Sequence, residues 1–79
     1  MTEEEMVLVV LEYWEQFHRS RYRKLGRERA LREARACARL TRKEMDALKL
    51  IVPGMTDYEA WTETRNIFCF NPPPKIEDE

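Results

Sequence analysis

Residues 2–17, TEEEMVLVVLEYWEQF, decide the fold of this chain. Thr2 and Glu5 form a capping box, in which each side chain accepts a hydrogen bond from a backbone N–H of the first helical turn. Large apolar residues then recur at spacings of three and four, which predicts a helix with a wide apolar face. The run at residues 7–10 is also compatible with a buried strand, but the capping box and the continuing periodicity favour a helix over residues 3–24. Gly26 suits the end of that helix.

The same threonine–glutamate spacing occurs twice more along the chain. Thr41 with Glu44 and Thr56 with Glu59 each precede an apolar-periodic stretch, so both are predicted helix starts. The Pro53-Gly54 pair supplies a stop after the earlier of these helices. We therefore expect an all-α fold, a small bundle of about four helices over residues 3–24, 27–40, 42–52 and 57–69.

Small side chains dominate one face of the predicted helix over residues 27–40. We expect Trp14 and Phe17 of the first helix to fill the groove that these small residues leave, large against small. The later two helices are expected to turn the following side chains inward: Met45, Leu48, Ile51, Val52, Trp61 and Phe68.

The 79-residue length sets a single domain, expected over residues 1–70 and followed by a flexible, Pro-rich acidic tail over residues 71–79. A core of this size supplies only about 3–5 kcal/mol, so self-association is an expectation. Cys37 and Cys69 are interpreted as small hydrophobes rather than a disulfide. The longest apolar run, residues 6–11, is too short for a membrane span, and the acidic start does not resemble a signal peptide. We expect a cytoplasmic protein.

Charge is segregated along the chain although the total is only −1. Residues 1–18 hold five acidic and no basic residues, for a local charge of −5. Residues 19–43 hold eleven Lys and Arg against two Glu, a net +9, and residues 44–79 return to −5 with three basic and eight acidic residues. The basic middle is therefore the feature most indicative of a partner.

Arginines recur at helical spacing within this basic middle. Arginine presents a planar fork suited to phosphates and carboxylates. Two interpretations stay open. The basic stretch is either a binding surface for an acidic protein or nucleic acid, or a solvated face neutralised by the chain's own acids. Those acids include the Glu77-Asp78-Glu79 tail, and helix pairs such as Glu28–Arg32 and Arg29–Glu33 would neutralise the face locally. The residues predicted to bind a partner are Arg19, Arg21, Arg23, Arg32, Arg35, Arg39 and Arg42.

Catalytic and metal-binding patterns are not found in the sequence. His18 is the single histidine, so a nucleophile–base pair has one candidate base and no companion motif. A structural zinc site requires about four Cys or His ligands, and the two isolated glycines make no phosphate loop. We therefore expect no catalytic residues, no metal, no cofactor and no enzymatic activity.

Residues 40–51, LTRKEMDALKLI, and 54–59, GMTDYE, resemble the opening of a LuxR-type helix-turn-helix. The resemblance covers about a quarter of the chain and implies two helices joined by a turn. It stops before the helix that reads DNA in that family, because residues 66–74, NIFCFNPPP, do not suit a helix. Only the helix-turn-helix geometry is therefore carried over, and membership of the family is not.

These patterns lead to one functional expectation and two alternatives. The expectation is a small non-enzymatic adaptor or inhibitor that binds a protein or nucleoprotein through the arginine-rich surface, as is typical of accessory proteins of phages or mobile elements. The first alternative is a nucleic-acid-binding regulator with a helix-turn-helix-like hairpin. The second is a structural oligomerisation module in which the first helix packs against a copy of itself.

Overall fold

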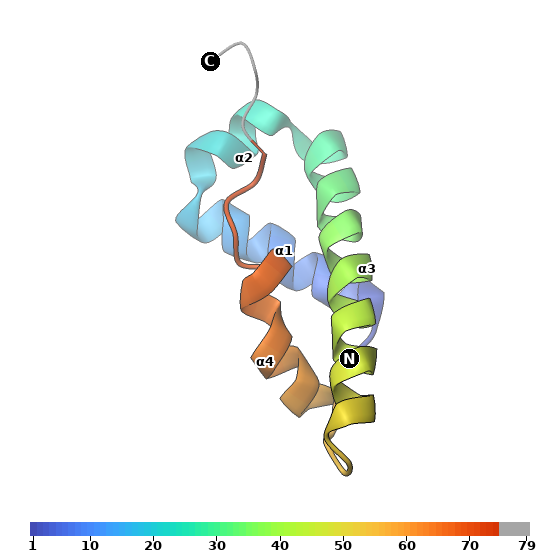
Figure 1. Cartoon of the computed structure of the whole chain (residues 1–79). Helices are drawn as coiled ribbons and strands as arrows, with labels where there is room; N and C mark the ends of the chain where they lie inside the picture. The colour runs from blue at the N-terminus through green and yellow to red at the C-terminus, as the bar shows by residue number, and fades with distance from the viewer. Residues whose placement is uncertain (75–79) are drawn as a thin grey trace.

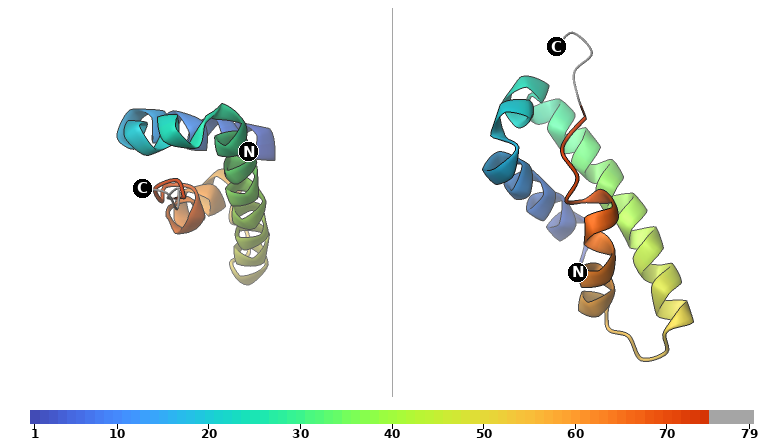
Figure 2. Two further views of the ribbon diagram at one scale, coloured as in Figure 1. Left: turned by 90° about the horizontal axis from the view of Figure 1, so that it is seen from above. Right: turned by 60° about the vertical axis from the view of Figure 1, so that its left-hand side comes forward.

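A computed structural model describes residues 1–74, and helices make up most of this range (Figure 1). They are α1 (Glu3–Phe17), α2 (Arg19–Leu25), α3 (Arg27–Ile51) and α4 (Asp57–Phe68). The long helix α3 contacts the other three, and α1 and α4 make the more extensive contacts with it. The right-hand view of Figure 2 shows α1 and α4 on the same side of α3. The expected all-α bundle is confirmed, and its helix boundaries differ from those predicted in two places.

Two of the three predicted capping boxes are formed. The Thr2 Oγ1 atom accepts a hydrogen bond from the Glu5 N–H at 3.1 Å, and the Glu5 carboxylate accepts one from the Thr2 N–H at 3.2 Å. The hydrogen bond from the Thr2 backbone N–H, and after it the interaction with the Thr2 side chain, lower the pKa of the Glu5 carboxyl. Thr56 and Glu59 repeat the arrangement at the start of α4. The local signals for these two helix starts were therefore sufficient.

The third predicted start, at Thr41, is wrong. Residues 27–51 form one uninterrupted helix, so the predicted helices over 27–40 and 42–52 are a single element. Thr41 lies inside that helix and is fully buried, and its hydroxyl lies 3.1 Å from the Sγ atom of Cys69. No glycine or proline occurs between Gly26 and Pro53, so nothing in the backbone ends the helix at residue 40.

The predicted first helix is also wrong in its length, because it is broken at His18. The chain leaves helical geometry there, with φ −135° and ψ 45°, and α2 begins at Arg19. No glycine or proline marks this break, and the apolar periodicity continues across it. The turn brings Leu25 into the core, whereas a straight helix would carry it away from α3. Gly26 ends α2 as predicted, with a positive φ of 86° that favours glycine.

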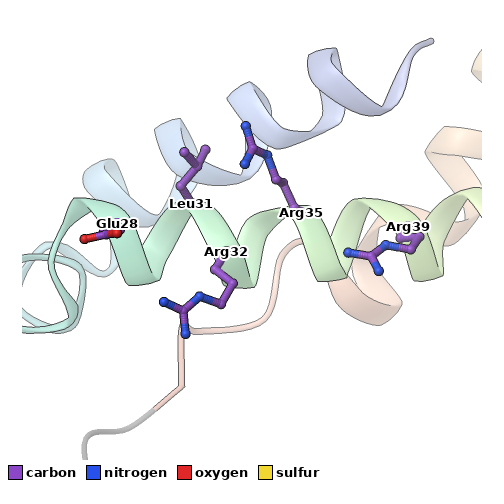
Figure 3. A pocket seen from close by; sticks show the side chains of 5 residues that line it. All are labelled: Glu28, Leu31, Arg32, Arg35 and Arg39. Atoms are coloured by element: carbon purple, nitrogen blue, oxygen red, sulfur yellow. The ribbon is translucent and has the colours of Figure 1, made fainter.

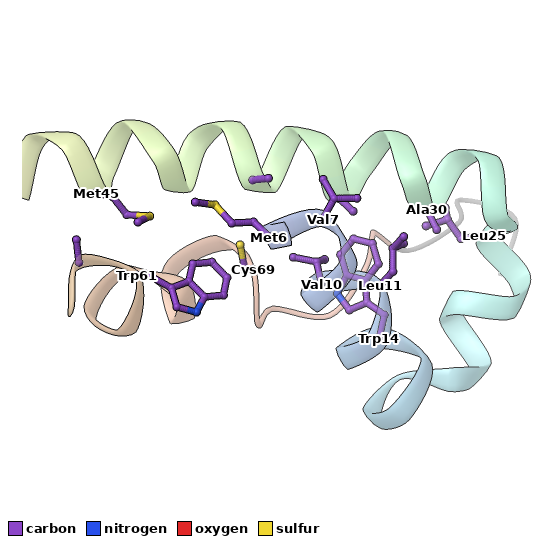
Figure 4. Close-up of a cluster of buried hydrophobic side chains, with 13 residues drawn as sticks. Met6, Val7, Val10, Leu11, Trp14, Leu25, Ala30, Met45, Trp61 and Cys69 are labelled. Atoms are coloured by element: carbon purple, nitrogen blue, oxygen red, sulfur yellow. The ribbon is translucent and has the colours of Figure 1, made fainter. Parts of the chain in front are cut away.

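The core lies along the inner face of α3 (Figure 4). Three fully buried alanines, Ala30, Ala34 and Ala38, let another helix approach closely, and α1 supplies the large side chains. Trp14 is buried as expected, and its Nε1 atom donates a hydrogen bond to the Asn71 carbonyl at 2.7 Å. Phe17 was expected there too, but it is 61% exposed because α1 ends at this residue.

The end of α3 departs from the predicted inward set. Met45 is fully buried and Leu48 is half-buried, whereas Ile51 and Val52 are exposed. The helix ends at Ile51 and the turn at Pro53-Gly54 follows, as predicted. Of the predicted α4 pair, Trp61 is buried and Phe68 is half-buried.

The predicted tail begins inside the described part of the chain and continues beyond it. Within residues 71–74, Pro73 is fully buried and the Asn71 carbonyl accepts the hydrogen bond from Trp14. Asn71 and Pro73 therefore contact the helices, and the flexibility predicted for the tail stays a prediction. The rest of the predicted tail, residues 75–79, lies outside the described residues. Within residues 1–74, no helix combines the length and apolar composition needed to cross a bilayer.

Candidate interaction surface

Three arginines of the predicted patch lie together on one face of α3. The side chains of Arg32, Arg35 and Arg39, with Glu28 and Leu31, line a shallow depression of about 390 Å³ (Figure 3). All three arginines are exposed, and the half-buried Leu31 lies beside them. Their spacings of three and four place them on successive turns of one side of the helix. We call Leu31, Arg32, Arg35 and Arg39 the arginine surface.

The arginine surface has no internal counter-ion within residues 1–74. The guanidinium groups of Arg32, Arg35 and Arg39 make no ion pair or hydrogen bond in this range. The two helix pairs expected to neutralise this face also form no salt bridge within residues 1–74. They are Glu28–Arg32 and Arg29–Glu33. These guanidinium groups can therefore bind an external carboxylate or phosphate without first breaking a salt bridge within residues 1–74.

Arg42, by contrast, is occupied within the molecule. Its Nη1 atom lies 2.7 Å from Asp57 Oδ1, and its Nη2 atom donates to the Met1 carbonyl and lies 3.4 Å from Asp57 Oδ2. The Met1 ammonium at 2.8 Å and Lys49 at 3.2 Å complete the ring of cations around Asp57. This cluster ties the start of α1 and the start of α4 to the middle of α3. Arg42 is therefore a structural residue and not part of the arginine surface.

The hydrogen bonds within this cluster favour the charged forms of both Arg42 and Asp57. The hydrogen bonds from Arg42, and after them those from the Met1 ammonium, hold the pKa of the Asp57 carboxyl well below its usual range. The same hydrogen bond from Arg42 to Asp57 raises the pKa of the guanidinium. Both groups are therefore charged across the physiological range, and their pairing is part of the fold.

The arginines of α2 lie around a different depression. Arg19 is exposed and Arg21 is half-buried, and both line a hollow of about 560 Å³ with Phe17, His18 and Pro72. Arg23 is exposed and lines neither hollow. The structure thus divides the seven predicted residues into a group on α3, a group on α2 and the internally paired Arg42.

The two cysteines are free thiols. Burial raises the pKa of Cys37 to about 11 and also raises the pKa of Cys69. At neutral pH neither thiol supplies the thiolate that nucleophilic chemistry requires. Within residues 1–74, no three His, Cys, Asp or Glu side chains lie where they would hold a metal ion together.

One surface feature was missed from the sequence. A hollow of about 300 Å³ lies between the end of α3 and α4, with apolar side chains in its lining. The sequence signal there is the apolar periodicity of residues 45–52, which predicts buried side chains. Side chains of the core and of an open groove share that periodicity, so the pattern alone did not separate them.

The chain was compared with protein families, curated proteins and solved structures. No family model matches the chain, and no curated protein and no solved structure matches it.

Proposed function

We propose that this protein is a small non-enzymatic adaptor or inhibitor that docks on an acidic surface of another protein through the arginine surface of α3. The observation that carries the proposal is the set of three exposed guanidinium groups around Leu31 that make no ion pair or hydrogen bond within residues 1–74. Arginine is enriched among the residues that dominate binding energy at protein interfaces.

The geometry suits a protein ligand for two reasons. The arginine surface projects from consecutive turns of a continuous helix. The backbone of these residues is therefore ordered before the partner binds, and binding costs no further backbone conformational entropy. Leu31 adds apolar area beside the charges, and water excluded from such a site strengthens each guanidinium–carboxylate hydrogen bond. A fork of this kind recognises Asp and Glu side chains in a bidentate manner.

A nucleic-acid ligand is the weaker proposal on the present observations. Nucleic-acid-binding domains are usually basic overall, whereas the net charge of this chain is −1 and both flanking segments are acidic. The α3–α4 hairpin exists, but α3 begins at Arg27 rather than at Thr41, and no helix follows α4 in residues 69–74. The hairpin therefore lacks a following helix to place in a DNA groove within the described range.

The homotypic alternative rested on the apolar face of α1. Most of that face, including Met6, Val10 and Trp14, is buried inside the chain. Leu8 is the one large apolar residue of α1 before Phe17 that stays exposed. Phe17 is also exposed, but its separation of nine residues from Leu8 places the two on opposite faces of the helix. Neither face therefore offers much apolar area for a copy of the chain, and this alternative has the least support.

Affinity capture with the immobilised full chain, read out by quantitative mass spectrometry, tests the proposal. Replacing Arg32, Arg35 and Arg39 together with Ala should reduce capture of the specific partner at least roughly tenfold, because central interface arginines each contribute about 2 kcal/mol or more. The variant should keep its fold, since the three side chains are exposed and Ala favours helix.

A matched control removes equal charge from the same helix. Arg27, Arg29 and Lys43 are exposed on α3 outside the arginine surface, and their triple Ala variant should capture the partner as the wild type does. Equal capture by both triple variants and the wild type would overturn the proposal. A gel shift with random DNA and RNA at about 50 and 200 mM salt separates the alternatives, because phosphate binding weakens steeply with salt.

A further inference from the structure

The second surface of interest is the groove between the end of α3 and α4. Ala47, Leu48 and Ile51 line it from α3, and Thr64 and Ile67 line it from α4. We call these five residues, with Glu44 and Glu63, the α3–α4 groove. Figures 1 and 2 show why it is open: the last turns of α3 extend past α1, and only α4 runs beside them.

The α3–α4 groove exposes large apolar side chains. Ile51 on α3 is 75% exposed and Ile67 on α4 is 49% exposed, and both line the groove. Leu50, which is 86% exposed, precedes Ile51 in the chain but does not line the groove. Apolar area in water is unfavourable by roughly 25 cal/mol per Å². A cluster of such side chains in a hollow, rather than scattered singly, is typical of an interaction site.

The rim of the groove is negatively charged. Glu44 stands on the α3 side and Glu63 on the α4 side, both exposed and both without an ion pair in residues 1–74. The two cations in residues 44–74 are engaged elsewhere: Lys49 pairs with Asp57, and the Arg65 guanidinium lies 5.3 Å from the centre of the Phe70 ring. An apolar floor between two unpaired carboxylates therefore favours a ligand that is apolar on one face and basic at its flanks.

We infer that the α3–α4 groove binds an amphipathic helix of a partner protein, with apolar residues at i, i+3, i+4 and i+7 facing the groove and Lys or Arg flanking them. An amphipathic helix laid between two helices is a recurrent mode of recognition. The groove lies on the half of α3 away from the arginine surface, and its charge is opposite, so this inference stands independently of the proposed function.

A second copy of this chain fits the groove less well. A two-fold dimer through this face would bring Glu44 and Glu63 of both copies together, and like charges at an interface are unfavourable. Docking the arginine surface of another copy would supply cations, but only one apolar side chain, the half-buried Leu31, to fill the hollow. The charges and the apolar floor together thus favour a different, basic partner.

The test uses two labelled synthetic peptides of about 18 residues, or five helical turns, with the same leucine face. One carries Lys at the flanking positions and the other carries Glu. Fluorescence anisotropy with the full chain should show the Lys peptide binding at least about tenfold more tightly than the Glu peptide. Equal affinity of the two peptides, or no binding of either, would overturn the inference.

Paired variants locate the binding to the groove. The Ile51→Ser/Ile67→Ser variant should weaken the Lys peptide about tenfold, and Leu8→Ser, an exposed apolar residue on α1, should leave it unchanged. Loss of the same size in Leu8→Ser would contradict a site in the groove. Circular dichroism of each variant verifies that its helix content is retained.

Charge variants test whether Glu44 and Glu63 attract the basic flanks of the peptide. Glu44→Gln/Glu63→Gln should weaken the Lys peptide about three- to tenfold at low salt, whereas Glu12→Gln/Glu15→Gln, with the same charge change on exposed residues of α1, should not. Equal effects of the two pairs would mean general attraction to an acidic protein and would overturn the inference. So would sedimentation that shows a dimer dissociated by Ile51→Ser/Ile67→Ser, because the occupant would then be a second copy.

Discussion

The two halves of α3 have opposite surfaces. In residues 27–40 the three buried alanines face inward, toward α1, and the arginine surface is open to solvent, as is Leu40, which is 45% exposed. In residues 41–51 the cations Arg42 and Lys49 are paired with Asp57, and the exposed side chains at the helix end, Leu50 and Ile51, are apolar. Within residues 1–74, the first half of the helix thus presents three unpaired arginines side by side, and the second half ends in exposed apolar side chains.

The difference follows from what covers each half. Helix α1 has a broad apolar face that packs on the alanine face of the first half, so the inward side of that half is covered. Helix α4 is shorter and is joined to α3 by a tight turn, so it covers one side of the second half only. The molecule is elongated, with extents of 45 × 19 × 18 Å, and its two candidate surfaces lie on different halves of the long helix.

Loss of Trp14 should have the largest effect. Trp14→Ala removes a fully buried ring that packs beneath the first half of α3 and a hydrogen bond to Asn71. We expect a loss of about 3–5 kcal/mol, enough to unfold a domain of this size. Phe17→Ala, with an exposed ring at the end of the same helix, should cost under about 1 kcal/mol. Urea unfolding followed by circular dichroism measures both, and equal losses would contradict the packing described for α1.

Enlarging an alanine should distinguish the two halves of α3 directly. Ala34 is fully buried beneath α1, so Ala34→Leu overpacks the interface and should destabilise the protein by about 1–3 kcal/mol. Ala47 is exposed in the open half, so Ala47→Leu should change stability by less than about 0.5 kcal/mol. Thermal unfolding of the two variants is the measurement. Similar destabilisation in both would mean that the second half is covered as well.

The Asp57 cluster should give a smaller, pH-dependent effect. The pKa of Asp57 is lowered by its partners, so its stabilisation is present above its unfolded pKa of about 3.9 and is lost as the pH falls through the folded value. Asp57→Asn should cost about 1 kcal/mol at neutral pH, because the carboxylate is partly exposed and screened. The variant should also lose stability less steeply below about pH 4 than the wild type does.

Asp46→Asn supplies the control for this cluster. Asp46 lies 3.6 Å from the same guanidinium but its side chain is 62% exposed, so its removal should have little effect at any pH. Urea unfolding between about pH 2 and 7 compares the three proteins. If the free energy of unfolding of the wild type and of Asp57→Asn had the same pH dependence, Asp57 would not be the residue that joins α1, α3 and α4 by ion pairs.

The parts of the fold that were predictable from the sequence are those set by local chemistry. The Thr2 and Thr56 caps are formed by residues three positions apart, and Gly26 and Gly54 adopt the positive φ that favours glycine. Thr41 carries the same local signal as the two caps. Its burial against Cys69, 28 positions away, is a tertiary contact that no local pattern encodes.

For the candidate surface, too, only the part that depends on the helix alone was predictable from the sequence. Helical spacing grouped Arg32, Arg35 and Arg39 correctly on one face, because that grouping needs only the helix. The same spacing added Arg42, whose partner Asp57 lies on the next helix and was not assigned to it. Likewise Ile51 looked like core, since the sequence does not state how far α1 extends along α3.

One uninterrupted helix carries both candidate surfaces in a fixed relation. Amide hydrogen exchange at residues 42 and 43 distinguishes this helix from two helices that meet at Thr41. In a continuous α3 the N–H groups of Arg42 and Lys43 are bonded within the helix and should exchange as slowly as those of their neighbours. Rapid exchange at these two residues, as at the unbonded first turn of a helix that starts after Thr41, would contradict the account.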